Sequence, residues 1–253
     1  MNEAREAFWS DYYQQLSSHA EPWLDYSNER VQAQTFAVVL EALGPVVGRR
    51  CLDVGCGFGY LSRALEALGA SEVTGIDVTA QFIERSRKEH PSVRWEVGTL
   101  DDPRFCAGLG TFDRILLVEM LQYVPVAETL RRAWEMLAPG GRLAAVVPNR
   151  ECPIVGRAME RFPGQFIPPT PAELASIGEA LCAGGAGSWG LKGMSFAEEQ
   201  TLNPYEISPW TRPAQLAGSP RGASLAKPPN RLAFEAVRAA EPSSGLRGPP
   251  TEG

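Results

Sequence analysis

The chain has 253 residues, enough for one large α/β domain or two small ones. Hydrophobic residues make up 44% of it, which permits a sizeable core and argues against global disorder. The formal net charge of -6 argues against a nucleic-acid partner or an anionic membrane surface, because such partners favour a basic protein surface.

Targeting signals and cysteines both favour the cytoplasm. The N-terminus, MNEAREAFWSDYYQQ, has no basic stretch followed by an apolar one, so we expect no signal peptide. No window reaches about 18 uninterrupted apolar residues, so we expect no membrane span. The cysteines are odd in number and form no C-x-x-C pair, which favours buried, reduced thiols over a metal or redox site. They are Cys51, Cys56, Cys106, Cys152 and Cys182.

Two helices are predicted before the first strand, because apolar side chains recur there twice at helical spacing. A break near Pro22 separates the two sets. The first set is Phe8, Trp9, Tyr12, Tyr13 and Leu16, and the second is Phe36, Val39, Leu40 and Leu43.

Strands and helices then alternate, with Pro139-Gly140-Gly141 predicted as the turn into the fifth strand. Repeated β-α units imply a parallel sheet with helices on both faces, and right-handed crossovers make it doubly wound. Ligands of such sheets bind at the carboxyl ends of the strands, so we expect the chemistry just after Val54, Ile76, Val97 and Val118. The predicted strands are 50–54, 73–77, 93–97, 112–118 and 142–147, and the helices are 61–68, 80–89 and 126–137.

Beyond residue 149 the alternation loosens. We predict helices at 154–162 and 171–183, a weak strand at 188–196 and a better one at 230–238. A Pro-rich stretch at about 198–229 is predicted to be a functional lid or disordered, because structureless connections of that length are uncommon. The tail, PSSGLRGPPTEG, is predicted to be disordered.

A Gly-rich turn follows the first strand, in the sequence LDVGCGFGYL that starts at Leu52. Glycines there allow a tight turn and the close approach of a ligand, and the helix beginning near Tyr60 offers free N–H groups. The turn departs from the dinucleotide fingerprint G-x-G-x-x-G, because the third glycine, Gly59, comes one place early. It also begins with an acid, Asp53, which suits a ligand ammonium better than a pyrophosphate. A second acid, Asp77, lies 20 residues after Gly57, where it can accept hydrogen bonds from a ribose diol.

Four ordered segments resemble the motifs of class I S-adenosylmethionine-dependent methyltransferases over about residues 50–149. They are LDVGCGFGYLS, GIDVTAQFIERSR, FDRILLVEMLQYV and AWEMLAPGGRLAAVVPN. The resemblance implies a Rossmann-like, mostly parallel seven-stranded sheet whose last strand, NRLAFEAVR, is antiparallel. It also implies S-adenosylmethionine as the methyl donor and S-adenosylhomocysteine as the product. We predict an N-terminal helical cover (1–45), a methyltransferase domain (46–240) with acceptor-site insertions at about 150–170 and 198–229, and a tail (241–253).

The resemblance also implies which positions hold the cofactor. The Gly-rich turn and the acid before it would hold the methionine part, and Asp77 would hold the ribose hydroxyls. Val78 and the turn from Gly98 to Leu100 would contact adenine. Many relatives carry Asp at the position of Thr99, so that contact falls to Asp101 or to backbone N–H groups. The full set predicted to bind the cofactor is Asp53, Gly55, Cys56, Gly57, Tyr60, Asp77, Val78, Thr99, Leu100, Asp101, Glu119 and Met120.

The candidates for a catalytic base are few, and no metal is expected. Methyl transfer from an activated sulfonium is an in-line displacement, which depends on alignment and desolvation, and a base helps only some acceptors. Glu119 is the best-placed candidate, although closing the strand or holding cofactor is an equal alternative. His19 and Tyr13 lie in the N-terminal segment that often covers the site in this family, whereas His90 is predicted to lie far from it.

The acceptor pocket is expected after the fifth strand, where Phe162, Phe166 and Ile167 either line it or pack in the core. The N-terminal rings either close over the cofactor, through cation–π attraction to the sulfonium, or pack as an amphipathic helix. These rings are Tyr12, Tyr13, Trp23 and Tyr26. Arg30 and Arg157 either pair with an acidic substrate or the cofactor carboxylate, or lie on the solvated surface. Trp189, Tyr205 and Trp210 are candidate residues of a lid.

The sequence predicts methyl transfer to a small-molecule acceptor, such as a natural product or metabolite. A methyltransferase acting on a protein or tRNA is the first alternative; Glu119-Met120-Leu121-Gln122 stands where nucleic-acid amino-methylating enzymes often carry Asn/Asp-Pro-Pro-aromatic. A non-catalytic S-adenosylmethionine-binding module is a further alternative, and the intact set of Asp53, Gly55, Gly57 and Asp77 argues against it. A nicotinamide-dependent oxidoreductase is the last, and the displaced third glycine and the acid at position 53 argue against it. The sequence does not predict the oligomeric state.

Overall fold

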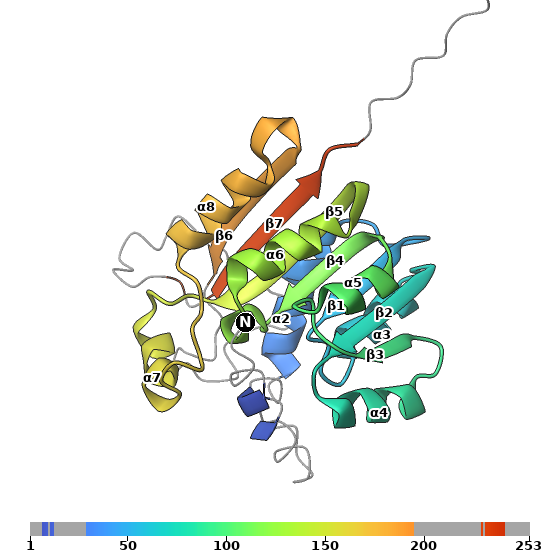
Figure 1. The fold of residues 1–253 in the computed structure, drawn as a ribbon, viewed down its shortest axis with the longest axis horizontal. Coiled ribbons are helices and arrows are strands. Elements are labelled where there is room, and N and C mark those ends of the chain that lie inside the picture. Colours follow the sequence, from blue (N-terminus) through green and yellow to red (C-terminus); the bar gives the residue numbers. More distant parts are fainter. Residues whose placement is uncertain (1–6, 10, 13–28, 195–228, 230, 241–253) are drawn as a thin grey trace, which may run out of the picture.

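A computed structural model describes residues 7–9, 11–12, 29–194, 229 and 231–240. Its centre is a seven-stranded sheet in the order β3-β2-β1-β4-β5-β7-β6 (Figure 1). Parallel pairing joins β3 through β5, whereas β7 runs antiparallel to both of its neighbours, β5 and β6. The strands are β1 Arg50–Val54, β2 Glu72–Asp77, β3 Arg94–Val97, β4 Phe112–Val118, β5 Leu137–Pro148, β6 Gly187–Met194 and β7 Arg231–Arg238. The sheet confirms the doubly wound, mostly parallel fold with an antiparallel last strand.

Helices cover both faces of the sheet (Figure 1). They are α2 Glu29–Leu43, α3 Tyr60–Ala67, α4 Ala80–Glu89, α5 Pro103–Leu109, α6 Val126–Glu135, α7 Pro153–Arg161 and α8 Pro171–Leu181. Short 3-10 helices lie at Leu121–Tyr123 and Ala183–Gly185, and residues 7–9 and 11–12 are also helical. Among the described residues, no helix is both long and apolar enough to cross a membrane.

Two hydrophobic clusters form the core, one on each face of the sheet. In β4, Ile115 and Leu117 pack in the cluster that includes side chains of α6 and α8. Leu116 and Val118 pack in the other cluster, with side chains of α2, α3 and α4. Successive side chains of a strand point to opposite faces, so an uninterrupted apolar strand is the expected pattern for a sheet buried on both sides. The two clusters therefore fix β4 in the centre of the sheet, and its carboxyl end in the interior of the molecule.

Two local predictions differ from the structure. Helix α5 had no predicted counterpart; it is a short helix whose start is marked by Asp102, which accepts a hydrogen bond from the backbone of Arg104, and by Pro103 in its first turn. The Pro139-Gly140-Gly141 segment belongs to β5, which already begins at Leu137 and pairs there with Phe112. A register shift between Phe112 and Arg114 absorbs the irregular backbone, so a turn-like sequence lies inside a strand.

Candidate functional site

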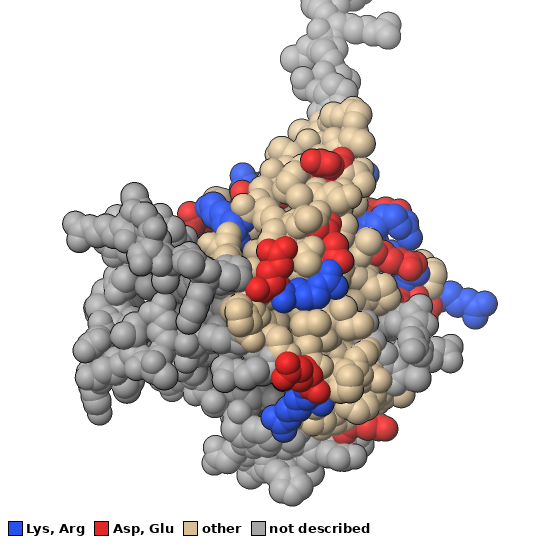
Figure 2. Space-filling model, turned by 90° about the vertical axis from the view of Figure 1, so that its left-hand side faces the viewer, with Lys and Arg blue, Asp and Glu red and all other residues tan. Residues whose placement is uncertain are grey.

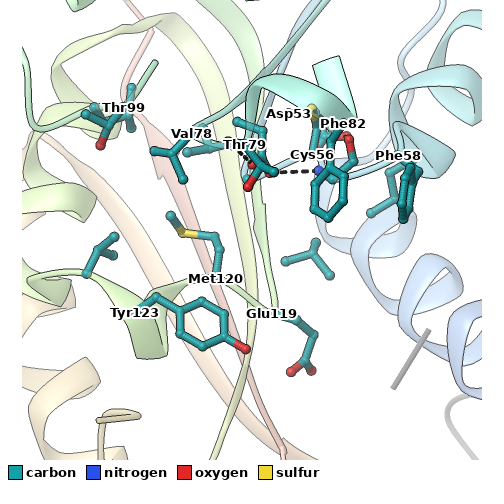
Figure 3. A pocket seen from close by; sticks show the side chains of 18 of the residues that line it. Asp53, Cys56, Phe58, Val78, Thr79, Phe82, Thr99, Glu119, Met120 and Tyr123 are labelled. Carbon is teal, nitrogen blue, oxygen red and sulfur yellow. Dashed lines mark hydrogen bonds between the residues drawn. The ribbon is translucent and has the colours of Figure 1, made fainter. Parts of the chain in front are cut away.

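A pocket opens at the carboxyl ends of the first four strands, where the topology predicted it (Figure 3). It comprises about 1180 Å³ including its open mouth. Its walls carry all but one of the predicted cofactor-binding residues. These are Asp53, Gly55, Cys56, Gly57, Tyr60, Asp77, Val78, Thr99, Leu100, Glu119 and Met120.

The Gly-rich turn has a backbone that only glycine adopts readily. Gly55 has φ +71°, and a side chain there would lie 2.8 Å from Cβ of Met120. Gly59 has φ +72°, and its added Cβ would lie 2.1 Å from the ring of Trp95. Gly57, with φ +51°, has no atom within 4 Å of an added Cβ, so its bare backbone faces open space. Packing therefore explains the early third glycine, and the turn leaves room for a ligand at Gly57.

Asp77 ties the second strand to this turn. Its carboxylate accepts hydrogen bonds from the backbone N–H groups of Gly57, at 2.9 Å, and Thr79, at 2.8 Å. Burial raises the pKa of Asp77, and the hydrogen bonds from Thr79, Gly57 and Val78 oppose that rise. Each carboxylate oxygen has a second lone pair, so the two oxygens can still accept a pair of ligand hydroxyls.

Asp53 lies deeper, at the end of β1, with only 2% of its surface exposed. Its carboxylate accepts a 2.7 Å hydrogen bond from the hydroxyl of Ser62. Burial raises the pKa of Asp53 to about 7, and the nearby Asp77 adds to the rise, while the Ser62 hydrogen bond opposes it. Burial also raises the pKa of the neighbouring Cys56 thiol well above its ordinary value, so this thiol is protonated and a poor nucleophile.

The turn after β3 supplies one end of the pocket. Thr99 and Leu100 line it, and the Thr99 hydroxyl accepts a hydrogen bond from the backbone of Asp101 at 3.2 Å. Asp101 itself is not among the pocket residues. Its carboxylate lies 3.8 Å from the guanidinium of Arg132 on α6, which draws it away from the cavity. The structure therefore does not bring Asp101 to the cofactor site, contrary to the sequence-based expectation.

Glu119, directly after β4, has an unusual backbone and a cationic partner. Its φ is +51°, a value that side-chain-bearing residues rarely adopt. Its carboxylate accepts a 2.7 Å hydrogen bond from Nε of Arg231, the first residue of β7, and both side chains are largely buried. The carboxylate lines the pocket with Met120 and Tyr123 (Figure 3). A carboxylate held by a guanidinium is better suited to positioning and charge balance than to taking up a proton.

Aromatic side chains from distant parts of the chain close one side of the pocket. Trp9 lines it, and its ring centroid lies 4.5 Å from that of Tyr123. The indole N–H of Trp9 donates a 2.9 Å hydrogen bond to the carbonyl of Gln165. The ring centroid of Phe162 lies 5.2 Å from that of Trp9, and the ring centroid of Phe166 lies 5.8 Å from that of Tyr123. We call Trp9, Tyr123, Phe162 and Phe166 the aromatic wall.

Several pocket residues were not predicted as such. The sequence around Trp9, Phe36 and Tyr123 indicated only a helix or the end of a strand. Phe58 and Phe82, whose ring centroids lie 4.3 Å apart, line the side of the pocket opposite the aromatic wall. Aromatic residues directly beside the Gly-rich turn and the second acid were the available signal. The others are Val54, Leu61, Thr79, Val118, Val124 and Thr129, whereas Gly98, which also lines the pocket, belongs to the turn predicted to contact adenine.

Other candidates lie elsewhere. His90 caps the end of α4, with its ring 2.8 Å from the guanidinium of Arg63, and is not among the pocket residues. Trp189 is part of β6, stacks on Phe234 and packs, partly buried, against the hydrophobic core instead of forming part of a lid. Ile167 is 36% exposed and donates its backbone N–H to Gln122. The candidates outside the described residues or side chains are Tyr13, His19, Trp23, Tyr26, Arg30, Arg157, Tyr205 and Trp210.

The fold and the pocket together define a class: a Rossmann-like protein with a nucleoside-type site at the strand ends. Residues 51–141 match the family model described as a methyltransferase domain. A ubiquinone biosynthesis O-methyltransferase of Xanthomonas oryzae pv. oryzae (strain PXO99A) is 35% identical over 127 residues, 44% of this chain and 52% of that protein. The chain thus spans about half the length of this curated relative.

Solved structures show the same fold. An S-adenosylmethionine-dependent methyltransferase from Mesorhizobium loti matches with a TM-score of 0.57 and 21% identity, over 83% of this chain and 100% of that one. The plantazolicin methyltransferase BpumL, solved with a pentazolic desmethylPZN analog and SAH, matches with a TM-score of 0.61 and 16% identity, over 93% and 95%. The matched segment is thus similar to a methyltransferase domain, as the four motifs of the sequence indicated, and the solved methyltransferase structures share the fold.

Proposed function

We propose that this protein transfers a methyl group from S-adenosylmethionine to a small-molecule acceptor, such as a natural product or metabolite. The observation that carries the proposal is the Asp77 carboxylate, which lines the pocket directly beside the bare backbone of Gly57. A ribose diol fits the lone pairs of Asp77, and the open space at Gly57 accepts the chain that joins ribose to the methionine part.

The residues of the pocket suit such a ligand from end to end. Asp53 lies near the place where the methionine ammonium would bind, and its carboxylate would be ionised by that contact. Val78 and Leu100 offer apolar surface for the base. Bound S-adenosylmethionine supplies a methyl group on a positively charged sulfur. The contribution of the protein is to align that methyl with the acceptor and to exclude water.

The aromatic wall supports a small acceptor with a flat or apolar body. Trp9 and Tyr123 are the wall residues that line the pocket, next to Met120 and Glu119. Ring faces contact planar apolar groups well and stabilise a neighbouring sulfonium. With Glu119 held by Arg231, we propose that this carboxylate fixes the geometry at the acceptor side. The roles of His19 and Tyr13, which lie outside the described residues, remain predictions.

A protein or tRNA acceptor is less well supported. The face of the molecule in Figure 2 intersperses cationic and anionic side chains instead of gathering the cations into one area. Phosphate backbones are bound by clustered Lys and Arg. We therefore keep a small acceptor as the proposal.

The five unpaired cysteines support the predicted cytoplasmic location, because oxidising compartments favour disulfides.

Calorimetric titration with S-adenosylhomocysteine tests the cofactor site. We expect micromolar binding to the wild type and a loss of about 10-fold or more in Asp77→Ala, because hydrogen bonds to a charged group contribute about 1.5–3 kcal/mol each. Asp77→Asn keeps an acceptor for the Gly57 N–H and separates the loss of charge from a disturbed turn.

Asp101→Asn is the matched control, since Asp101 is a nearby acid that does not line the pocket. It should bind S-adenosylhomocysteine within about 2-fold of the wild type. A folded wild type that does not bind S-adenosylhomocysteine would contradict the proposal. Equal losses in Asp77→Asn and Asp101→Asn would contradict the assigned site.

A further inference from the structure

Thr129, on α6, has a hydroxyl group that the fold itself does not use. Its side chain is 1% exposed and lines the pocket. The hydroxyl oxygen has no hydrogen-bond partner among the described residues. Threonine in a helix commonly bonds the carbonyl four residues earlier, here that of Pro125, but among the described residues that carbonyl accepts the backbone N–H of Thr129 and not its hydroxyl. A buried hydroxyl without a partner costs free energy, so it calls for an explanation.

The position of Thr129 on its helix places it beside the turn after β3. Arg132, one turn further along α6, donates a hydrogen bond to the carbonyl of Leu100. Leu100 and Thr129 both line the pocket. Thr99 and Val78 lie on this side of the cavity, away from Phe58 and Phe82 (Figure 3).

The other polar side chains of this region interact with groups of the protein itself, although the Thr79 hydroxyl and the Asp101 carboxylate oxygens have no hydrogen bond among the described residues. The Thr99 hydroxyl accepts from the backbone of Asp101, and Asp101 faces Arg132. Thr79 lies beside the carboxylate of Asp77 and helps to lower its pKa. The Thr129 hydroxyl therefore remains available for a ligand.

We infer that the Thr129 hydroxyl binds the polar edge of the adenine base, and that Thr129 is a specificity-determining residue for the cofactor. The inference rests on the proposed function, because that function places adenine beside Val78 and Leu100. The edge of adenine that points away from the ribose carries the 6-amino group, N1 and N7. A hydroxyl both donates and accepts, so it matches either kind of edge atom.

Thr129→Val tests this inference, because valine has nearly the same shape and lacks the hydroxyl. Titration with S-adenosylhomocysteine should show about 3- to 10-fold weaker binding than in the wild type, as for one lost neutral hydrogen bond. The melting temperature without ligand should stay the same or rise, since valine removes an unpartnered buried polar group. Thr129→Ser, which keeps the hydroxyl, should bind within about 2-fold of the wild type.

Two analogues probe the base directly. S-inosylhomocysteine replaces the 6-amino group by oxygen, and the 7-deaza analogue of S-adenosylhomocysteine lacks N7. The wild type should discriminate against one of them more strongly than Thr129→Val does. Equal affinity of wild type and Thr129→Val for S-adenosylhomocysteine, or unchanged discrimination against both analogues, would overturn the inference. Equal losses in the valine and serine variants would also overturn it. Failure of the wild type to bind would instead refute the proposed function.

Discussion

The two sides of the pocket are built in different ways. On the cofactor side, Asp77 binds Gly57, only 20 residues away, and both follow neighbouring strands. On the side that we propose holds the acceptor, called the acceptor side below, the indole N–H of Trp9 donates a hydrogen bond to Gln165, 156 residues away, and Glu119 pairs with Arg231, 112 residues away. The cofactor side is thus set by the local sequence and the strand order, whereas the acceptor side depends on long-range contacts between loops and termini.

This difference bears on how such proteins diversify. Backbone N–H groups, bare glycines and buried acids at strand ends are fixed by the core of the sheet. The aromatic wall joins the N-terminal segment to residues that follow β4 and α7. Changes there leave the sheet intact, so the acceptor can change while the cofactor site stays the same. Three predictions test whether the cofactor side is really the stiffer and more sequence-local of the two.

Gly59→Ala is expected to have the largest effect on stability. The added Cβ would lie 2.1 Å from the ring of Trp95. Trp95 is 3% exposed and held by a 2.8 Å hydrogen bond from its indole N–H to the carbonyl of His90, so it cannot move aside easily. Steric overlap and a left-handed backbone together should lower the free energy of unfolding by about 2–5 kcal/mol, measured in urea.

Gly48→Ala is the control for the cost of placing alanine in a left-handed backbone conformation. Gly48 has a similar φ of +68°, but no atom lies within 4 Å of an added Cβ. Its cost should be only about 1–2 kcal/mol. If the two variants were equally stable, the packing of Trp95 against the Gly-rich turn would not restrain the cofactor side.

Arg231→Met tests the acceptor side. The Arg231 and Glu119 side chains are 7% and 13% exposed, and removing the guanidinium leaves a buried carboxylate without this partner. The free energy of unfolding should fall by about 3 kcal/mol. The double variant Glu119→Gln, Arg231→Met should be less destabilised than the sum of the single variants, by about 0.5–3 kcal/mol of coupling.

Arg85→Met provides the comparison for an exposed pair. Arg85 and Glu89 lie 2.7 Å apart on the surface of α4, with side chains 57% and 49% exposed. Its loss, which also removes the contact of Arg85 with the Phe58 ring, should cost clearly less than the loss of Arg231. If Arg231→Met cost no more than Arg85→Met, the ion pair would not be what holds Glu119 in place.

The sequence predicted the parallel half of the fold well for a physical reason. An apolar strand such as Phe112–Val118 and an amphipathic helix such as Ala80–Glu89 are encoded locally, by patterns of period 2 or 3.6. The start of β5 was predicted wrongly, because Pro139-Gly140-Gly141 is a local turn signal. Only the pairing of Leu137 with Phe112, a long-range contact, places it in a strand.

The site shows the same division. The predicted cofactor residues that follow strands β1, β2 and β4 line one pocket, since strand ends meet at one edge of the sheet. Asp101 is the exception, because an arginine on α6 draws its carboxylate away, and nothing in the local sequence signals that contact. Trp9 and Arg231 could not be assigned either, since their roles depend on partners more than 100 residues away.

The proton on Asp53 makes the stability of the folded protein depend on pH. Burial raises its pKa from 3.8 to about 7, so between these values the folded protein keeps a proton that the unfolded chain has lost. Stability should therefore fall as pH rises from about 4 to 7, by up to about 1.4 kcal/mol per pH unit, and level off above. Urea unfolding at several pH values measures the slope. Asp77, whose pKa burial also raises, adds a slope of the same sign.

Asp53→Asn isolates the contribution of this carboxyl group, since asparagine still offers an oxygen to the Ser62 hydroxyl. The variant should show a shallower fall in stability over that range and a higher stability than the wild type above pH 7. Parallel curves would mean that Asp53 is ionised in the folded protein at low pH. A ligand ammonium would favour the ionised form, so S-adenosylhomocysteine should bind the wild type more tightly as pH rises towards 7, with release of a proton. The absence of that trend in Asp53→Asn would tie the buried acid to the methionine end of the cofactor site.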